Sequence, residues 1–250
     1  MTRAWRSLPL IVVGGWGVDA LMLAPVVRSW PAEVRYESLN DELLADCGSI
    51  CEVADVLTRR HPEPAVWLGW SQGAQVAMAA AGVKDSLVQS VVTVAGFPRF
   101  VKAPEWPCGM EPATFQAFVA GLNSNAQRTW RRFQQLMIHG CRQSERSEAR
   151  QELMTWIENG PAASAANLVK GLQWLADEDQ RKVWQCSDVP ALHLSGSHDT
   201  LVAPWDQQLS LPECAECRVI PGMTHWPRGQ HAINCGRSMA EFFTQQQEVV

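Results

Sequence analysis

The chain has 250 residues, which is enough for one large α/β domain with a sizeable core. Hydrophobic residues make up 46% of it, an ordinary fraction for a globular protein, and the formal net charge of −5 argues against nucleic acid or an anionic membrane surface as a partner. No apolar run reaches the ~18 residues that a membrane helix needs, and the first residues lack the pattern of a signal peptide. We therefore expect a cytoplasmic protein, and a monomer.

The eight cysteines raise the question of a metal site or of disulfides. The closest spacings join Cys47 with Cys51 and Cys214 with Cys217. A structural zinc site would need a second such pair or a nearby pair of histidines, and neither accompanies them. We expect reduced thiols, no metal ion and no organic cofactor.

Strands and helices alternate along the first hundred residues. Apolar, β-branched runs predict strands, and apolar residues repeated at helical period predict helices. The expected strands cover residues 8–13, 34–39, 65–68 and 87–95, and the expected helices cover 19–30, 47–60 and the segment that follows the third strand as far as 81. Such alternation predicts an α/β fold, a mostly parallel sheet with helices on both faces.

The alternation stops between residues 99 and 184. Four helices are expected there, at 113–122, 126–139, 145–159 and 164–176. It then resumes with a strand at 190–194, a helix near 205–209, a strand at 217–220 and a last helix at 232–247. We therefore expect a core made of residues 1–98 and 185–250, with residues 99–184 inserted as a helical cap.

The third strand leads into Gly69-Trp70-Ser71-Gln72-Gly73, and strong helix formers follow. This pattern is typical of the nucleophile elbow, a turn so tight that the residues two before and two after the serine must be small. The helix that follows would present its free N–H groups near the Ser71 hydroxyl. A glycine-rich turn with an incidental serine is the alternative, but the expected strand and helix on either side favour a nucleophile.

A second glycine-rich loop, Gly14-Gly15-Trp16-Gly17, follows the first strand. In this architecture such a loop supplies one N–H of an oxyanion hole, and the residue after the nucleophile supplies the other. We expect the main-chain N–H groups of Trp16 and Gln72 in these roles. Without the elbow, a plain turn would be the simpler interpretation.

A serine nucleophile needs a histidine to accept its proton and a carboxylate to orient the histidine. Asp199 follows the strand at 190–194, and His225 follows the strand at 217–220. Both would therefore lie at the same edge of the sheet as Ser71. Asp188 and Asp206 are rival acids, but neither follows a strand so directly. The other five histidines are less well placed to face Ser71.

Arginines are concentrated in the expected cap. Residues 127–150 contain six arginines and two glutamates, a net charge of +4 within a chain of −5. Arg128 and Arg132 are four apart on one expected helix, as are Arg146 and Arg150 on the next, so each pair shares a helix face. Helices usually carry such charge as a solvated surface, yet an all-arginine patch also suits an acidic partner.

With these features in view, the sequence resembles the α/β-hydrolase family and, within it, the esterases that act on pimeloyl-acyl carrier protein methyl esters in biotin synthesis. The similarity is densest in Val-Trp-Leu-Gly-Trp-Ser at 66–71, Val-Val-Thr-Val-Ala at 91–95, Glu-Trp-Pro at 105–107 and Gln-Arg-Thr at 127–129. It extends more loosely over most of the chain.

The resemblance implies a role for each candidate residue. Ser71 would be the nucleophile with Asp199 and His225 as its partners, and Trp16 and Gln72 would be the oxyanion donors. Further residues would bind substrate and carrier: Trp16, Phe133 and Met137 in an acyl pocket, and Arg128, Arg132, Arg146 and Arg150 against an acidic carrier protein. The family usually has histidine at the position of Gly14 and leucine at that of Gln72; both changes keep the main-chain donors.

The sequence is therefore interpreted as that of a serine carboxylesterase for the methyl ester of pimeloyl-acyl carrier protein. One alternative is a general short-chain carboxylesterase or thioesterase without a carrier partner, its arginines merely solvated. Another is a binding protein on a hydrolase fold, against which the complete set of Ser71, Asp199 and His225 argues.

Overall fold

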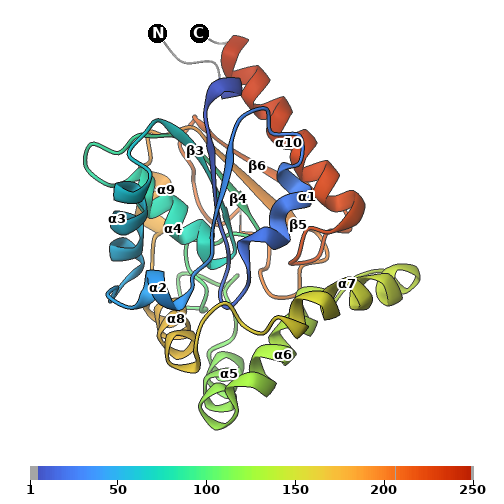
Figure 1. Cartoon of the computed structure of the whole chain (residues 1–250). Coiled ribbons are helices and arrows are strands. Elements are labelled where there is room, and N and C mark those ends of the chain that lie inside the picture. Colours follow the sequence, from blue (N-terminus) through green and yellow to red (C-terminus); the bar gives the residue numbers. More distant parts are fainter. Residues whose placement is uncertain (1–4, 206, 249–250) are drawn as a thin grey trace.

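The computed structural model describes residues 5–205 and 207–248, and its centre is a parallel β-sheet between two layers of helices (Figure 1). Among the described residues, six strands pair in the order β2-β1-β3-β4-β5-β6, and every pairing is parallel. Their bounds are Leu10–Val13 (β1), Val34–Glu37 (β2), Ala65–Trp70 (β3), Val88–Val94 (β4), Ala191–Gly196 (β5) and Ala215–Ile220 (β6). The expected parallel sheet is confirmed.

Burial along the strands follows from their place in the sheet. β1 and β3 are buried at every residue, as continuous apolar runs covered on both faces must be. β2 and β6 lie at the two edges and are mostly half-buried. The register pairs Trp70 with Val94 and Gly196 with Ile220, so the carboxyl ends of these strands meet at one edge of the sheet.

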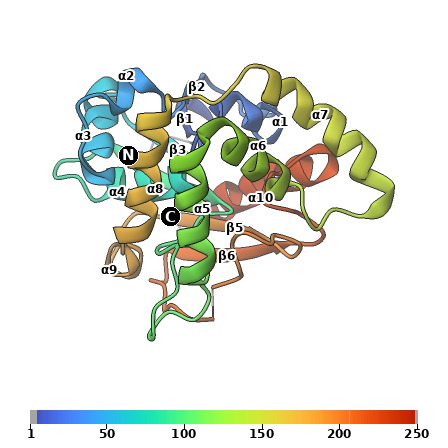
Figure 2. The same cartoon turned by 90° about the horizontal axis from the view of Figure 1, so that it is seen from below.

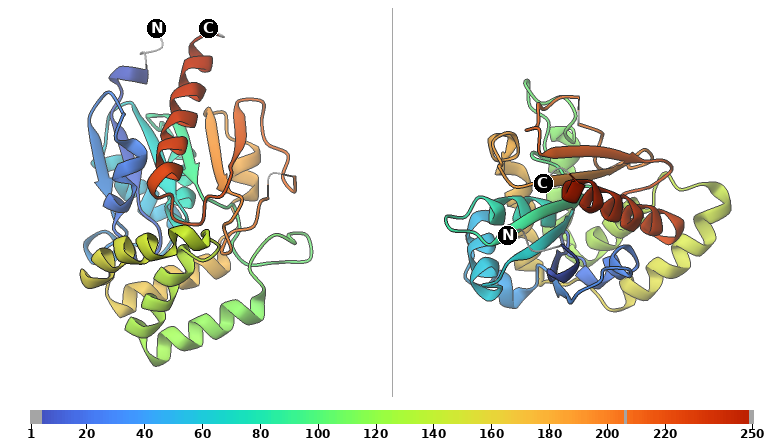
Figure 3. Two further views of the ribbon diagram at one scale, coloured as in Figure 1. Left: turned by 90° about the vertical axis from the view of Figure 1, so that its right-hand side faces the viewer. Right: turned by 90° about the horizontal axis from the view of Figure 1, so that it is seen from above.

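Helices cover both faces of the sheet (Figures 1 and 3). α3 and α4 pack together on one face, with α9 against α4, and α1 and α10 pack together on the other. The bounds are Ala24–Val27 (α1), Asp41–Leu44 (α2), Ile50–Arg60 (α3), Gln72–Ala81 (α4), Arg181–Gln185 (α9) and Gly229–Glu248 (α10). Short 3₁₀ helices occupy Trp5–Ser7, Ala20–Leu23 and Gln143–Glu145.

The segment between β4 and β5 carries four longer helices, as the sequence predicts. They are α5 (Pro112–Ser124), α6 (Ala126–Met137), α7 (Arg146–Glu158) and α8 (Ala165–Asp177). All four lie across the edge where the strands end, and the view from below shows them spread over it (Figure 2). Among the described helices, none is both long enough and apolar enough to cross a bilayer.

The prediction of a helix near residues 205–209 is wrong. Residue 206 lies outside the described residues, and the flanking ones form a turn closed by a hydrogen bond from the Gln208 N–H to the Trp205 carbonyl, 2.8 Å. Pro204 and Pro212 leave only a short segment between them, and so short a helix would form too few backbone hydrogen bonds to be stable. The Trp205 indole instead donates to the Gly96 carbonyl at 2.8 Å, which ties this loop to the end of β4.

Other helix limits also differ from those expected. The helix expected at 19–30 is a 3₁₀ turn followed by the short α1, because Pro25 has no N–H to continue an α-helical ladder. α3 begins at Ile50 rather than near residue 47, since the Ser49 hydroxyl accepts the Glu52 N–H as its N-cap. The short helices α2 and α9 were not predicted.

Candidate active site

Ser71 lies on a strained turn between β3 and α4. Its backbone is left-handed, with φ 55° and ψ −121°, a conformation that non-glycine residues seldom adopt. A Cβ atom on Gly69 would clash with the carbonyl oxygen of Gly73, and one on Gly73 would clash with that of Val13. Only glycine at both positions allows this turn, and the turn carries Ser71 past the end of β3 to the N-terminus of α4.

Three side chains from distant parts of the chain are hydrogen-bonded in series at this turn. The Ser71 Oγ lies 3.0 Å from His225 Nε2, and His225 Nδ1 lies 2.8 Å from Asp199 Oδ2. A carboxylate only accepts, so Nδ1 carries the proton and Nε2 is left to accept the Ser71 hydroxyl proton. Ser71 is 7% exposed and His225 is 1% exposed, so bulk water has little access to the pair.

The loops that carry the acid and the histidine are held by further hydrogen bonds. Asp199, which follows β5, accepts the main-chain N–H groups of Leu201 at 2.8 Å and Val202 at 3.0 Å through its second oxygen. The His225 carbonyl, in the loop after β6, accepts the Trp70 indole N–H at 2.9 Å. Of the rival acids, Asp188 is exposed and is not a partner of His225, whose two ring nitrogens pair with Asp199 and Ser71; Asp206 lies outside the described residues.

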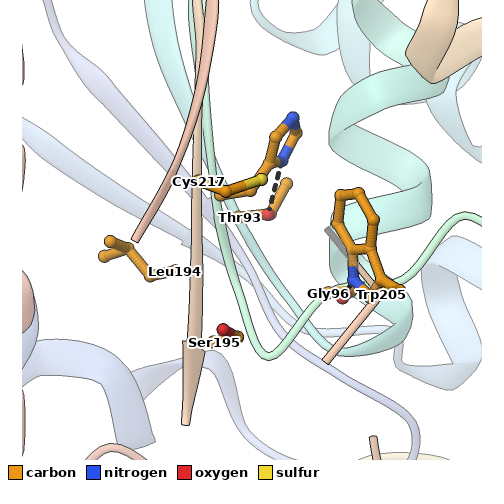
Figure 4. A pocket seen from close by; sticks show the side chains of 7 residues that line it. Thr93, Gly96, Leu194, Ser195, Trp205 and Cys217 are labelled. Atoms are coloured by element: carbon orange, nitrogen blue, oxygen red, sulfur yellow. Dashed lines mark hydrogen bonds between the residues drawn. The ribbon is translucent and has the colours of Figure 1, made fainter. Parts of the chain in front are cut away.

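A second histidine is buried in the core, away from this series. His193 of β5 shares a hydrogen bond of 2.9 Å with the Thr93 hydroxyl of β4, and its ring stacks on Trp184 at 4.7 Å. Figure 4 shows Thr93 and Trp205 beside a cavity of about 10 Å³, with that hydrogen bond dashed. Complete burial lowers the pKa of the His193 imidazole to about 3, so it is neutral at ordinary pH.

The glycine-rich loop after β1 passes directly against the nucleophile. A Cβ atom on Gly15 would lie 3.1 Å from the Ser71 Cβ and 3.2 Å from the Trp70 carbonyl oxygen. The next residue, Trp16, is thereby brought beside Ser71. Gln72 is the first residue of α4, so its main-chain N–H has no acceptor within the helix. The loop and the helix terminus thus meet at Ser71.

Aromatic rings form an apolar wall next to the histidine. Phe133 of α6 meets Trp16 edge to face at 5.0 Å, and its centroid is 6.4 Å from that of His225. Met137 is fully buried, and its carbonyl accepts the N–H of Trp226, the residue after His225, at 3.1 Å. Phe118 of α5 completes the wall, 5.6 Å from Trp16. Sequence reasoning missed Phe118, although its spacing from Phe115 and Leu122 is helical.

The arginines predicted to contact a partner lie on α6 and α7. Arg128, Arg132, Arg146 and Arg150 are all exposed, and none forms an ion pair within the part of the chain that the structure describes. Two acids of α7 pair with another residue: Glu148 lies 3.2 Å and Glu152 2.7 Å from the buried guanidinium of Arg228. Among the described residues, the four arginines therefore present their charge to solvent rather than to an ion-pair partner. No group of side chains suited to a metal ion occurs among the described residues.

Curated relatives cover nearly all of the chain. A protein of Edwardsiella ictaluri named pimeloyl-[acyl-carrier protein] methyl ester esterase is 31% identical over 242 residues, which cover 93% of this chain and 92% of that protein. One of the same name from Stenotrophomonas maltophilia is 36% identical over 212 residues, covering 80% and 78%. The resemblance inferred from the sequence is confirmed.

Solved structures share the fold at low identity. An esterase from Exiguobacterium antarcticum superposes with a TM-score of 0.76 at 14% identity and covers 95% of this chain and 92% of its own. An enol-lactonase from Burkholderia xenovorans gives 0.75 at 16% identity, with coverages of 95% and 92%. The sequence model of the alpha/beta hydrolase family matches residues 8–232, and the chain therefore belongs to the α/β-hydrolase family.

Proposed function

We propose that this protein is a serine carboxylesterase that hydrolyses the methyl ester of a pimeloyl chain carried on acyl carrier protein, in biotin synthesis. The observation that carries the proposal is the unbroken hydrogen-bonded series from Ser71 through His225 to Asp199. The names of the curated relatives support the choice of substrate, because their similarity spans almost the whole of both chains.

In the first half of the reaction, Ser71 Oγ attacks the ester carbonyl carbon while His225 Nε2 takes the serine proton. Asp199 stabilises the imidazolium that forms and keeps the ring oriented. The carbonyl oxygen becomes negative and accepts hydrogen bonds from the main-chain N–H groups of Trp16 and Gln72. When the intermediate collapses, His225 returns the proton to the leaving oxygen, and methanol departs.

In the second half, water attacks the acyl-serine, with His225 again accepting the proton. The same two N–H groups stabilise the second oxyanion, and the free carboxylic acid leaves. Every proton passes through His225, so the reaction needs neither a metal ion nor an organic cofactor. The rings of Trp16 and Phe133 and the buried side chain of Met137 form the apolar surface along which the acyl chain lies.

In this proposal, residues 99–184 form a helical cap over the active site. Residues 1–98 and 185–250 form the α/β-hydrolase core beneath it. The exposed arginines of α6 and α7 dock the carrier. This substrate has two acyl bonds, a thioester to the carrier and the methyl ester at the far end of the chain. Docking the carrier on the cap holds the thioester away from Ser71 and presents the methyl ester to it. We place the reaction in the cytoplasm.

The test compares hydrolysis of the carrier-bound methyl ester with that of p-nitrophenyl butyrate. Ser71→Ala should abolish both activities, since no other hydroxyl takes its place. Changing Arg128, Arg132, Arg146 and Arg150 to alanine should lower kcat/KM for the carrier substrate at least about tenfold and leave the small ester unchanged. Initial rates over a range of substrate concentrations give both constants.

A matched control removes the same number of positive charges from the surface outside the cap. Four exposed cations outside the cap are changed to alanine together: Arg28, Arg59, Lys84 and Arg237. This variant should hydrolyse both substrates at the rate of the unaltered protein. A protein that cleaves the small ester but ignores the carrier substrate is a general esterase. Failure of a fluorophosphonate to label Ser71 would instead indicate a binding protein without turnover.

A further inference from the structure

Helix α8 is hydrogen-bonded to both residues that we assign as oxyanion donors. The Trp16 indole N–H donates to the Leu168 carbonyl at 2.8 Å, and the Gln72 side-chain amide donates to the Gly171 carbonyl at 2.7 Å. Both bonds are buried. Leu168 and Gly171 are three residues apart, so their carbonyls lie on one face of the helix, about 4.5 Å apart along its axis.

The missing side chain of Gly171 lets the two donors converge there. A Cβ atom at this position would lie 3.0 Å from the Trp16 Cδ1 and 3.3 Å from the Gln72 Oε1. Trp16 and Gln72 belong to different elements, the loop after β1 and the start of α4. They therefore meet through a single turn of α8.

An oxyanion hole works only when two N–H groups point at one oxygen atom, and small displacements are costly. Trp16 lies between Gly15 and Gly17, and glycines leave a loop many accessible backbone conformations. The elbow that carries Gln72 is fixed by the sheet. The loop, in contrast, needs an external restraint to stay in register with it.

We propose that the Gln72 side chain and Gly171 position the oxyanion hole, with α8 as a brace that fixes the separation of the Trp16 and Gln72 N–H groups. The proposal rests on the esterase function assigned above. The Gln72 side-chain amide is a positioning group, since it acts on the loop through α8, whereas its main-chain N–H contacts the substrate. Gln72 is only 1% exposed, so losing the amide's partner is costly.

Contacts that do not involve the oxyanion residues also anchor α8. Lys170 Nζ donates to the Leu44 carbonyl at 2.8 Å, and the Trp174 indole donates to the Gly48 carbonyl at 2.9 Å. The Asn167 amide donates to Asp41 at 2.6 Å. The helix therefore stays docked when the Gln72 bond is removed, and the effect of that change is confined to the donors.

The test measures hydrolysis of p-nitrophenyl butyrate per active serine, counted by fluorophosphonate titration. Gln72→Met keeps the length of the side chain but cannot donate, and should lower kcat about tenfold with KM within twofold. Affinity for a trifluoromethyl ketone, which mimics the tetrahedral intermediate, should fall in parallel. Gly171→Ala should give a similar loss, and the double variant should lose less than the product of the two.

Lys170→Met is the control, because it also removes a hydrogen bond from a side chain to a main-chain carbonyl between α8 and the rest of the protein. It should lower the melting temperature and leave kcat unchanged. An unchanged kcat in Gln72→Met, or an equal loss in Lys170→Met, overturns the brace. These assays use a small ester, so a protein that rejects the carrier substrate overturns only the proposed substrate, and the brace is still tested.

Discussion

At the scale of single residues, Asp199 has two tasks that only a carboxylate can combine. One oxygen accepts the Nδ1 proton of His225 at 2.8 Å. The other accepts the N–H groups of Leu201 and Val202, which fix the orientation of the side chain. All three groups around it are donors, so both oxygens of the side chain must accept.

This arrangement predicts the effect of Asp199→Asn. With its oxygen toward Leu201 and Val202, the new amide points its NH₂ group at His225 and forces the proton onto Nε2. The imidazole then cannot accept the proton of Ser71, and kcat should fall by about three to four orders of magnitude. The check is the steady-state rate on p-nitrophenyl butyrate, together with far-UV circular dichroism to establish that the variant is folded.

Asp188→Asn serves as the comparison. Asp188 is exposed, and it is the alternative to Asp199 that lies among the residues the structure describes. It should retain full activity. A large loss in Asp188→Asn, or a loss below about tenfold in Asp199→Asn, would mean that Asp199 does not orient His225.

At the scale of elements, β5 combines a functional end with a buried titratable group. Asp199 follows the strand, whereas His193 lies within it, against the rings of Trp184 and Trp205. The lining of the neighbouring cavity contains no carboxylate, so nothing there stabilises an imidazolium. The lowered pKa of His193 makes folding depend on pH.

The direction of this pH dependence follows from the pKa of His193 in the unfolded and the folded protein. The unfolded imidazole has its ordinary pKa of 6.5, and the folded one has a pKa of about 3. Below pH 6.5 the unfolded chain binds a proton that the folded protein does not, so stability is lost as pH falls toward 3, by up to about 1.4 kcal/mol per pH unit. Urea unfolding at pH 7, 6, 5 and 4.5 measures this loss.

His193→Asn is the informative variant, because its side-chain oxygen can still pair with the Thr93 hydroxyl but does not titrate. Its free energy of unfolding should vary less between pH 7 and 4.5 than that of the unaltered protein. Taking the difference between the two proteins removes the contribution of His231, whose pKa burial also lowers. Parallel pH profiles would show that His193 does not carry the dependence.

The elements themselves were largely predictable because their signals are local. Apolar periodicity and a glycine-flanked serine locate β3, α4 and the turn between them within a few residues. One of the limits that were wrong reflects proline: Pro25 lacks the N–H that a helix over 19–30 would need, although periodicity alone would continue it.

The docking of α8 was beyond such reasoning. Its bonds to Trp16 and Gln72 join residues 152 and 99 positions apart in the sequence. No local pattern encodes which carbonyl of a helix meets which distant side chain. The glycine at 171 was visible, but inside a helical pattern it signals only a weak helix former until the packing around it is known.

At the scale of the whole molecule, charge is unevenly distributed. Residues 127–150 carry +4 in a chain of −5, so the remaining residues carry −9. Glu148 and Glu152 of α7 pair with Arg228 and not with the exposed arginines of α6 and α7, whose side of the cap we call the arginine face. An acidic carrier would be attracted to this face and repelled by the rest of the surface, so the long-range field orients it before contact.

Salt dependence tests this field directly. Charges in solvent are screened over about 10 Å at 0.1 M ionic strength and about 3 Å at 1 M. Raising the ionic strength from about 0.05 to about 0.5 M should therefore lower kcat/KM for the carrier substrate about tenfold or more, while p-nitrophenyl butyrate, which is uncharged, should change less than twofold. The variant lacking Arg128, Arg132, Arg146 and Arg150 should begin at a low rate and show a shallow dependence. Equal salt slopes for this variant and the unaltered protein would place the attraction elsewhere on the surface, and the arginine face would then be only solvated charge.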